Sequence, residues 1–225
     1  MSELSISVII PAYNAEAYLP DAVASVRAQQ GVTIKEIIVI DDGSSDGTAS
    51  CAESLQCKVF RKERGGAGAA RNLGVEAATG ELVHFLDADD VLAEGALAAL
   101  TEPFYDDEKM AAVFGKAVDF ISPELSEEQQ NQLTARTEAY GGILPGCSVL
   151  RRSVFDEIGL FDTSLRSAET VAWMMKLREA GLATTEIPMV TLRRRIHMTN
   201  TGRVNRLQEM RNYAAVLRNR MKKHE

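Results

Sequence analysis

Three carboxylates lie close together immediately after an apolar stretch of the chain. The sequence HFLDADD at 84–90 places Asp87, Asp89 and Asp90 at the end of the run 81–86. Acids this close repel one another and are costly to desolvate without positive partners. On a strand, side chains two residues apart share a face, so Asp87 and Asp89 should point the same way. Such a pair suits a hard divalent cation that also binds phosphate oxygens and water, although an acidic turn capping a helix at 91–104 is the structural alternative.

A second acidic group follows another apolar run, IIVI at 37–40. The sequence DDGSSDGT begins with Asp41 and Asp42, which could accept hydrogen bonds from a base imide or a ribose hydroxyl. Asp46 suits the purely structural role of a helix cap. If the two apolar runs are neighbouring strands, these acids and those after residue 86 line one crevice.

A third segment of interest is the glycine-rich sequence GGAGAARNLG at 65–74. Glycines let a backbone approach a ligand closely, and the amides at a helix N-terminus attract phosphate. The segment is neither a dinucleotide fingerprint, because Arg71 stands where Gly or Ala is required, nor a P-loop. Arg71 could pair with a base carbonyl or a phosphate, or bridge local acids.

The first hundred residues must position these groups, and their pattern is that of alternating strands and helices. This alternation predicts a largely parallel sheet, whose strands bind ligands at their C-terminal ends. The expected strands are 6–12, 36–40, 58–61 and 81–86, and the expected helices are 15–30 (with Pro20 in its first turn), 48–56, 65–80 and 91–104.

The rest of the chain is less regular, but it shows no repeat and no linker that would separate a second domain. We expect a strand at 111–121, an exposed helix or loop at 122–137, a strand or loop and a short helix within 143–162, an amphipathic helix at 165–181, two strands within 183–197 broken at Pro188, and a basic helix at 203–225.

Composition excludes several classes of protein. The net charge of −7 argues against general affinity for nucleic acid. No run approaches the ~20 apolar residues of a membrane span, and the N-terminus MSELSISVII lacks the features of a signal peptide. The odd set of Cys51, Cys57 and Cys147 has no metal-ligand spacing and suits reduced thiols, so we expect a cytoplasmic protein.

Four segments in this order, SVIIPAYNAEAYL, VIDDGSSDGT, GGAGAARNLG and FLDADD, resemble the family 2 glycosyltransferases. The resemblance covers the first hundred residues and continues more loosely through GCSVLRRSVFDEIGLFD, the helix at 166–180 and RRRIHMTNTG. It implies an α/β protein of the GT-A fold: a Rossmann-like, mixed and mostly parallel sheet flanked by helices in one compact domain, 1–225. Residues 1–100 would form the nucleotide and metal half, and 101–202 the acceptor half.

The resemblance also implies roles for individual residues. Asp87 and Asp89 would be the DxD pair, with Asp89 the principal ligand of Mg²⁺ or Mn²⁺ on a sugar-nucleotide diphosphate. The other implied nucleotide contacts are Pro11, Ala12, Tyr13, Asp42, Gly66, Arg71 and His197, and the implied acceptor contacts are Gly146 and Trp173. From the residues alone, Trp173 could equally be a core side chain.

His197 shares a predicted strand face with Arg193 and Arg195. This stripe could close over the diphosphate. The alternative is a strand with exposed arginines and one packed histidine.

The catalytic base is the main departure from the family pattern. Inverting transfer needs one group to take the proton of the acceptor hydroxyl. Glu169 matches the first acid of the family's Glu-Asp pair, but Thr170 stands where the second, the usual base, belongs. Glu169 is our expected base, Asp162 is an alternative, and a third reading is a protein that binds nucleotide sugars with weak or no turnover.

The sequence therefore predicts a metal-dependent inverting glycosyltransferase that moves a sugar from a nucleoside-diphosphate donor, of UDP type, to a hydroxyl acceptor. The acceptor would be a glycan or a lipid-linked molecule. Basic residues in 203–225 suggest peripheral contact with anionic lipid, although a solvated basic face is the simpler reading. A nucleotidyltransferase fits poorly, because SVIIPAYNAEAYL lacks a glycine-rich loop with a basic residue.

Overall fold

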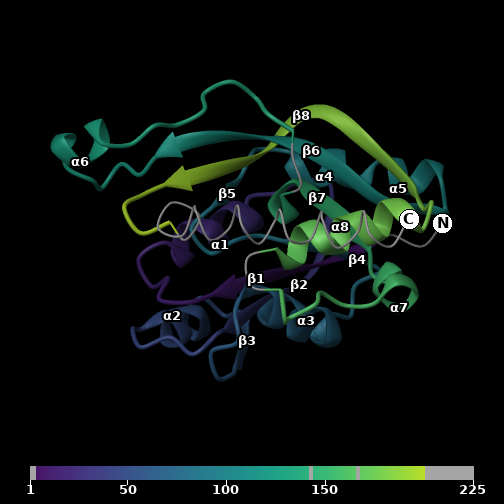
Figure 1. Cartoon of the computed structure of the whole chain (residues 1–225), viewed down its shortest axis with the longest axis horizontal. Helices are drawn as coiled ribbons and strands as arrows, with labels where there is room; N and C mark the ends of the chain where they lie inside the picture. The colour runs from purple at the N-terminus through teal and green to yellow at the C-terminus, as the bar shows by residue number, and fades with distance from the viewer. Residues whose placement is uncertain (1–3, 142–143, 166–167, 201–225) are drawn as a thin grey trace, which may run out of the picture.

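A single eight-stranded sheet organises the computed structural model, which describes residues 4–141, 144–165 and 168–200 (Figure 1). The strand order is β3-β2-β1-β4-β7-β6-β8-β5. The strands are β1 (Ser5–Ala12), β2 (Thr33–Asp41), β3 (Lys58–Arg61), β4 (Leu82–Phe85), β5 (Val91–Leu92), β6 (Met110–Ile121), β7 (Ser148–Arg151) and β8 (Ala183–Ile196). The predicted basic helix at 203–225 lies outside the described residues.

The direction of the strands brings distant loops to one edge of the sheet. Strands β1, β2, β3 and β4 are mutually parallel. Strand β7 is antiparallel to both β4 and β6, and β6 is parallel to β8. Strands β6 and β8 therefore run in the same direction as β1, so their C-terminal ends meet the same edge as the ends of β1, β2 and β4.

Helices cover both faces of this sheet. They are α1 (Leu19–Arg27), α2 (Thr48–Ser54), α3 (Ala67–Ala77), α4 (Ala96–Thr101), α5 (Pro103–Asp106), α6 (Glu127–Asn131), α7 (Val154–Ile158) and α8 (Glu169–Glu179), with a 3-10 turn, η1 (Pro145–Cys147). On β1, Val8 and Ile10 pack with buried residues of α1, α2 and α4, whereas Ile9 packs with those of α3, α7 and α8. Period-two alternation thus gives the sheet two separate cores.

Most predicted elements of the first hundred residues are confirmed, including Pro20 in the first turn of α1. The single helix expected at 91–104 is wrong. Val91 and Leu92 instead form β5, which pairs with Arg193 and Leu192 of β8. Gly95, at φ +68°, then starts α4, and α5 begins separately at residue 103.

The two strands expected around Pro188 form one continuous strand, β8. Its pairing with β6 passes from Glu186 opposite Phe114 to Val190 opposite Lys116. Four positions of β8 thus span two of β6, and Pro188 falls within this bulge, where no ladder donor is required.

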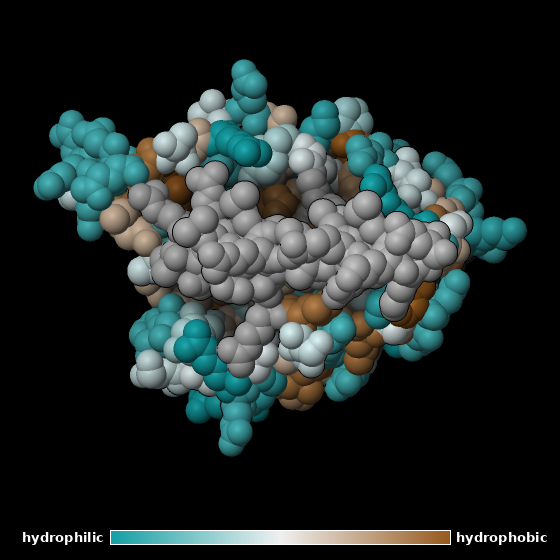
Figure 2. Space-filling model, viewed as in Figure 1, coloured by the Kyte–Doolittle hydropathy of each residue, from teal (hydrophilic) through white to brown (hydrophobic). Residues whose placement is uncertain are grey.

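The polar segment after β6 is mainly a loop with one short helix, α6. Ser126 and Gln129 form a capping box at the start of this helix. Figure 2 shows the α6 end of the molecule as a hydrophilic protrusion. The segment then returns to β6 through paired backbone bonds between Ala117 and Tyr140. No helix in the described ranges is both long and apolar enough to cross a bilayer.

Candidate functional site

The acidic sequence after β4 forms a turn rather than an extended strand end. The amide of Asp90 donates to the carbonyl of Asp87 over 3.0 Å. As a result Asp87 and Asp89 do not share a strand face, which corrects the geometry expected from the sequence. An Asp87 carboxylate oxygen is 2.8 Å from Arg71 of α3, whereas an Asp89 oxygen is 3.0 Å from Nε2 of His197. The turn therefore has positive or donor groups on both sides.

Arg195 and Asp90 hold this turn from within. The backbone amide of Arg195 donates to Asp90 Oδ1 over 2.8 Å, and its Nε donates to the carbonyl of Asp89 over 2.9 Å. Burial, together with the charges of Asp89 and Asp87, raises the pKa of Asp90 well above its usual value. The buried Arg195 guanidinium also binds Asp21 and Ser122, so it is not part of a stripe closing over a ligand.

His197 is both packed and directed at the acidic turn. Its Nδ1 lies 2.9 Å from the hydroxyl of Thr199, and its ring centroid is 4.6 Å from that of Tyr18. Asn200 completes the arrangement: it accepts the amide of His197 and donates to Asp89 over 3.3 Å. The two alternatives considered for His197 therefore coexist, because a buried imidazole still contacts the proposed metal ligand.

Arg71 joins the acidic turn to the start of α8. Its Nη1 lies 3.5 Å from a Glu169 carboxylate oxygen and donates to the Thr170 hydroxyl over 3.3 Å. Glu169 packs on α3 at Gly68, where an added Cβ would come within 2.7 Å of Glu169 Cγ. Asp87, Arg71 and Glu169 thus form one connected group, although 98 residues separate the last two.

Asp42 organises the glycine-rich segment that precedes α3. Its two oxygens accept the amides of Gly65 and Gly66 over 2.8 and 2.7 Å, and Lys62 Nζ lies 2.6 Å away. Gly66 has φ +89°, and a Cβ there would meet no atom within 4 Å. The backbone at Gly66 is therefore open to close approach by a ligand, while the Asp42 carboxylate fixes its position.

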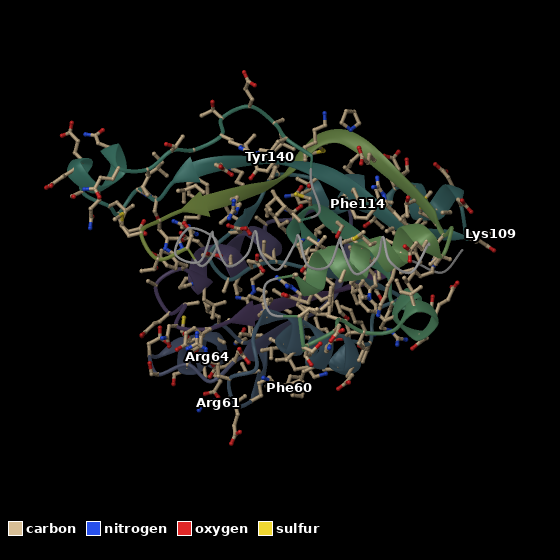
Figure 3. All side chains as sticks on the ribbon, viewed as in Figure 1. Phe60, Arg61, Arg64, Lys109, Phe114 and Tyr140 are labelled. Atoms are coloured by element: carbon tan, nitrogen blue, oxygen red, sulfur yellow. The ribbon has the colours of Figure 1, made fainter. Side chains whose placement is uncertain are left out.

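The end of β1 presents an aromatic ring beside this loop. Tyr13 is 39% exposed, and the guanidinium of Arg64 lies 3.7 Å from its ring centroid. Figure 3 labels Arg64 in the loop that follows β3. Ala12 is buried, and its carbonyl accepts the amide of Asp42 over 2.8 Å. Pro11 is half-buried within β1. Tyr13 is thus the member of this trio whose side chain can stack on a base.

The comparisons with known proteins agree with this arrangement. A family model described as glycosyl transferase family 2 matches residues 7–159, more than half of the chain. The chain belongs to this family. An uncharacterised glycosyltransferase of Rickettsia typhi is 30% identical over 221 residues, covering 91% of this chain and 68% of the relative. The GalNAc(5)-diNAcBac-PP-undecaprenol beta-1,3-glucosyltransferase of Campylobacter jejuni is 38% identical over 130 residues, covering 55% of this chain and 41% of that enzyme.

Solved structures share the fold of this glycosyltransferase. Staphylococcus aureus TarS 1-349 in complex with UDP-GlcNAc superposes with a TM-score of 0.67 at 24% identity, over 88% of this chain and 60% of that one. The structure of GalNAc-T7 with UDP, GalNAc and Mn²⁺ superposes with a TM-score of 0.72 at 21% identity, over 96% of this chain and 48% of that one. The GT-A fold predicted from the sequence is confirmed. Among the first relatives and the Campylobacter enzyme, the chain spans between 28% and 68% of the other protein's length.

The two residues expected to contact the acceptor lie in the interior of this family 2 enzyme. Trp173 is 1% exposed, stacks on Phe155 at 4.7 Å and donates to the carbonyl of Gly159. Its position facing the sheet, on the buried side of α8, makes it a core side chain. Gly146 is buried in η1, where a Cβ would come within 2.9 Å of Leu192. Neither residue presents a surface to a sugar, which corrects both assignments.

Asp162, the alternative base, is directed at its own turn. One oxygen accepts both the amide and the hydroxyl of Ser164, and these hydrogen bonds lower the pKa of Asp162. Glu169 is the acid that contacts Arg71 and the glycine-rich helix.

The acidic turn has the donor set of a hard-cation site. The side chains of Asp87 and Asp89 are 45% and 30% exposed, and the contacts with Arg71 and His197 use one oxygen of each. Within the described part of the chain, no group of three or more His, Cys, Asp or Glu residues could hold a metal by itself. The remaining carboxylate oxygens are of the type that Mg²⁺ or Mn²⁺ prefers, and phosphate and water would have to supply further ligands.

Sequence reasoning missed two residues of the site, Lys62 and Asn200. It named Arg195 as part of a stripe with His197, but not as the residue that holds the acidic turn from within. Lys62 and Asn200 follow strand ends as ordinary loop residues, and their contacts with Asp42 and Asp89 depend on tertiary structure.

Proposed function

We propose that this family 2 glycosyltransferase transfers a sugar, with inversion, from a uridine-type nucleoside-diphosphate donor to a hydroxyl acceptor, and that it uses Mg²⁺ or Mn²⁺. The observation that carries the proposal is the connected group Asp87–Arg71–Glu169 at the C-terminal edge of the sheet. In this group the guanidinium of Arg71 contacts both Asp87, on the side of the sugar donor, and Glu169, the candidate base. The UDP-GlcNAc complex of TarS and the Mn²⁺ complex of GalNAc-T7 support the donor and the metal.

The first half of the chain would bind the donor. Tyr13 offers a ring face to the base, and the loop held by Asp42 leaves the backbone at Gly66 open to close approach by the donor. The amides at the N-terminus of α3 favour the negative charge of a diphosphate. Asp87 and Asp89 would hold the metal, which supplies electrostatic stabilisation of the leaving diphosphate.

The second half would supply the base. Glu169 accepts the proton of the acceptor hydroxyl while the acceptor oxygen forms a bond to the anomeric carbon. The bond from that carbon to the diphosphate oxygen breaks, and the electron pair leaves with the nucleoside diphosphate. Attack from the side opposite the leaving group inverts the anomeric centre.

Binding of UDP, measured by calorimetry with and without Mn²⁺, tests the donor site. We expect Asp89→Ala to abolish the Mn²⁺-dependent part of UDP affinity, because the principal metal ligand is lost. Asp156→Ala, an exposed acid on α7, is the control and should bind as the wild type does. Equal UDP affinity with and without Mn²⁺ in the wild type would contradict a metal-dependent donor site.

A protein that binds the donor but turns it over weakly or not at all is the second candidate, because Thr170 occupies the usual base position. Glu169→Gln separates the two. If Glu169 is the base, kcat should fall by about 10²–10⁴-fold while UDP affinity is at least retained. Glu179→Gln, at the exposed end of the same helix, is the matched control. Unchanged slow turnover in Glu169→Gln would favour the binding protein.

The acceptor is proposed to be a glycan or a lipid-linked sugar. The polyprenol-linked substrate in the name of the Campylobacter relative supports the second class. Division into a donor half (1–100) and an acceptor half (101–202), peripheral lipid contact through 203–225 and a cytoplasmic location remain predictions.

A further inference from the structure

The guanidinium of Arg71 contacts three acceptors at unequal distances and still has an unused donor. Its side chain is only 6% exposed, and it contacts Asp87, Glu169 and Thr170 through its two terminal nitrogens. Its Nε is buried and has no hydrogen-bond partner among the described residues. An arginine has five N–H donors, so this one keeps donor capacity that its contacts with the described residues do not use.

The contacts of Arg71 differ in strength. The 2.8 Å bond to Asp87 has the length of a strong charge-assisted bond, whereas the 3.5 Å approach to Glu169 is at the outer limit. Glu169 is held near Arg71 partly by packing on Gly68 and is only 11% exposed. Of the two carboxylates, Glu169 is therefore the one that a better acceptor would displace.

We propose that Arg71 couples donor binding to the release of Glu169, an inference that rests on the proposed function. A nucleoside diphosphate seated beside Asp87 brings phosphate oxygens within reach of the Arg71 guanidinium. A phosphate oxygen replaces Glu169 as an acceptor of Nη1, and the freed Glu169 carboxylate can then accept a proton from the acceptor hydroxyl. Arg71 acts here as a positioning residue for the base.

The hydroxyl at Thr170 makes this exchange easier. It gives Arg71 Nη1 an acceptor that carries no charge, so it orients the guanidinium without holding it strongly. A carboxylate at position 170 would place a second negatively charged acceptor beside Arg71 Nη1. It would therefore compete with an incoming phosphate, which gives the departure at Thr170 a physical role.

Coupling between two sites is reciprocal, so the proposal predicts the direction in which nucleoside-diphosphate affinity changes when Glu169 is substituted. If the donor displaces Glu169 from Arg71, then removing the charge of Glu169 must strengthen binding of the nucleoside diphosphate. If Glu169 instead only positions Arg71, the same substitution weakens binding.

The experiment measures UDP affinity by calorimetry for the wild type, Glu169→Gln, Arg71→Lys and the double variant. We expect Glu169→Gln to tighten UDP binding about fivefold or more, the lower end of typical coupling between sites. In the Arg71→Lys background the gain in UDP affinity should be under about twofold. An ammonium keeps the positive charge but cannot bind Asp87 and Glu169 with two separate nitrogens as a guanidinium does. Equal gains in both backgrounds would mean through-space repulsion and would overturn the proposal, as would weaker or unchanged binding in Glu169→Gln.

A second variant keeps the test decisive if Arg71→Lys does not fold. Thr170→Asp, at a half-buried position, should weaken UDP binding by a similar factor, whereas Thr170→Ser should leave it within about twofold. Unchanged affinity in Thr170→Asp would refute the coupling. A wild type that binds no UDP and transfers no sugar would refute the proposed function itself, whereas sugar transfer without tighter binding in Glu169→Gln refutes only the coupling.

Discussion

The two halves of the sheet build the site in different ways. In the first half, the loops after β1, β2 and β4 leave parallel strands, and Asp42 reaches Gly65 across only 23 positions. In the second half, the contributing groups cross about a hundred positions: His197 meets Asp89 over 108, and Glu169 meets Arg71 over 98. The donor side is thus assembled from loops within the first hundred residues, whereas the proposed base and the support of the acidic turn depend on packing between the halves.

Contacts between the halves are accordingly where the contribution of the second half to the site can be tested by substitution. Three such contacts are well defined: His84 with Ser148, Arg195 with the turn at 87–90, and Gly68 with Glu169. Each joins a residue of the first hundred to one of the second half. Substitutions there test whether the second half only supports the sheet or also tunes the chemistry.

The largest expected effect is on stability, at His84. Its ring is fully buried on β4, and its Nδ1 donates to the carbonyl of Ser148 over 2.8 Å. Burial lowers the pKa of His84 from 6.5 to about 4, despite the opposing hydrogen bond. Between pH 6.5 and pH 4 the unfolded chain therefore binds a proton that the folded chain refuses, and stability falls as pH falls. The loss should reach roughly 3 kcal/mol at pH 4.

His84→Gln provides the comparison, because an amide can donate to Ser148 but does not titrate in this range. Urea denaturation of both proteins from pH 7 to pH 4 gives the difference in free energy of unfolding. That difference should change in favour of the glutamine variant as the pH falls. Parallel curves would mean that His84 becomes protonated without disrupting the contact between the two halves.

The contrast between the halves also explains what could be predicted from the sequence. Strands β1–β4 and their loops follow from short continuous apolar runs and turn residues, which are local signals. The sequence pattern of α8 did not decide whether Trp173 faces the core or the acceptor, because an indole ring can pack in a core or stack on a sugar. Residues 91–104 have helical composition, but pairing of Val91 and Leu92 with β8 overrides that local preference.

An intermediate effect is expected at Arg195, which holds the acidic turn from the second half. A lysine keeps the charge but cannot make the bonds to Asp89, Ser122 and Asp21 together. Loss of two of these bonds should cost about 2 kcal/mol of unfolding free energy, at about 1 kcal/mol each. Thermal or urea denaturation measures this cost.

The neighbouring arginine on the same strand is the matched control for Arg195→Lys. Arg193 is exposed, so Arg193→Lys should change stability by at most about 0.5 kcal/mol. If Arg195→Lys folds as stably as this control but weakens Mn²⁺-dependent UDP binding, Arg195 serves the shape of the turn rather than the stability of the sheet. If Arg195→Lys matches the control in both stability and Mn²⁺-dependent UDP binding, the turn at 87–90 keeps its conformation without the bonds from Arg195.

The smallest effect, and the most specific, is expected from Gly68→Ala. Gly68 lies in α3, where alanine is the better helix former by about 1 kcal/mol, so stability should not fall. The new Cβ would come within 2.7 Å of Glu169 Cγ and would push the proposed base away from its position. We expect kcat to fall about tenfold, equivalent to 1.4 kcal/mol, without a rise in the KM for the donor. Gly74→Ala on the same helix overlaps the core side chain of Ile9 instead, so it should lose stability with no selective effect on kcat. If both variants behave alike, the packing of Gly68 on Glu169 is structural, and the second half contributes support rather than chemistry at this contact.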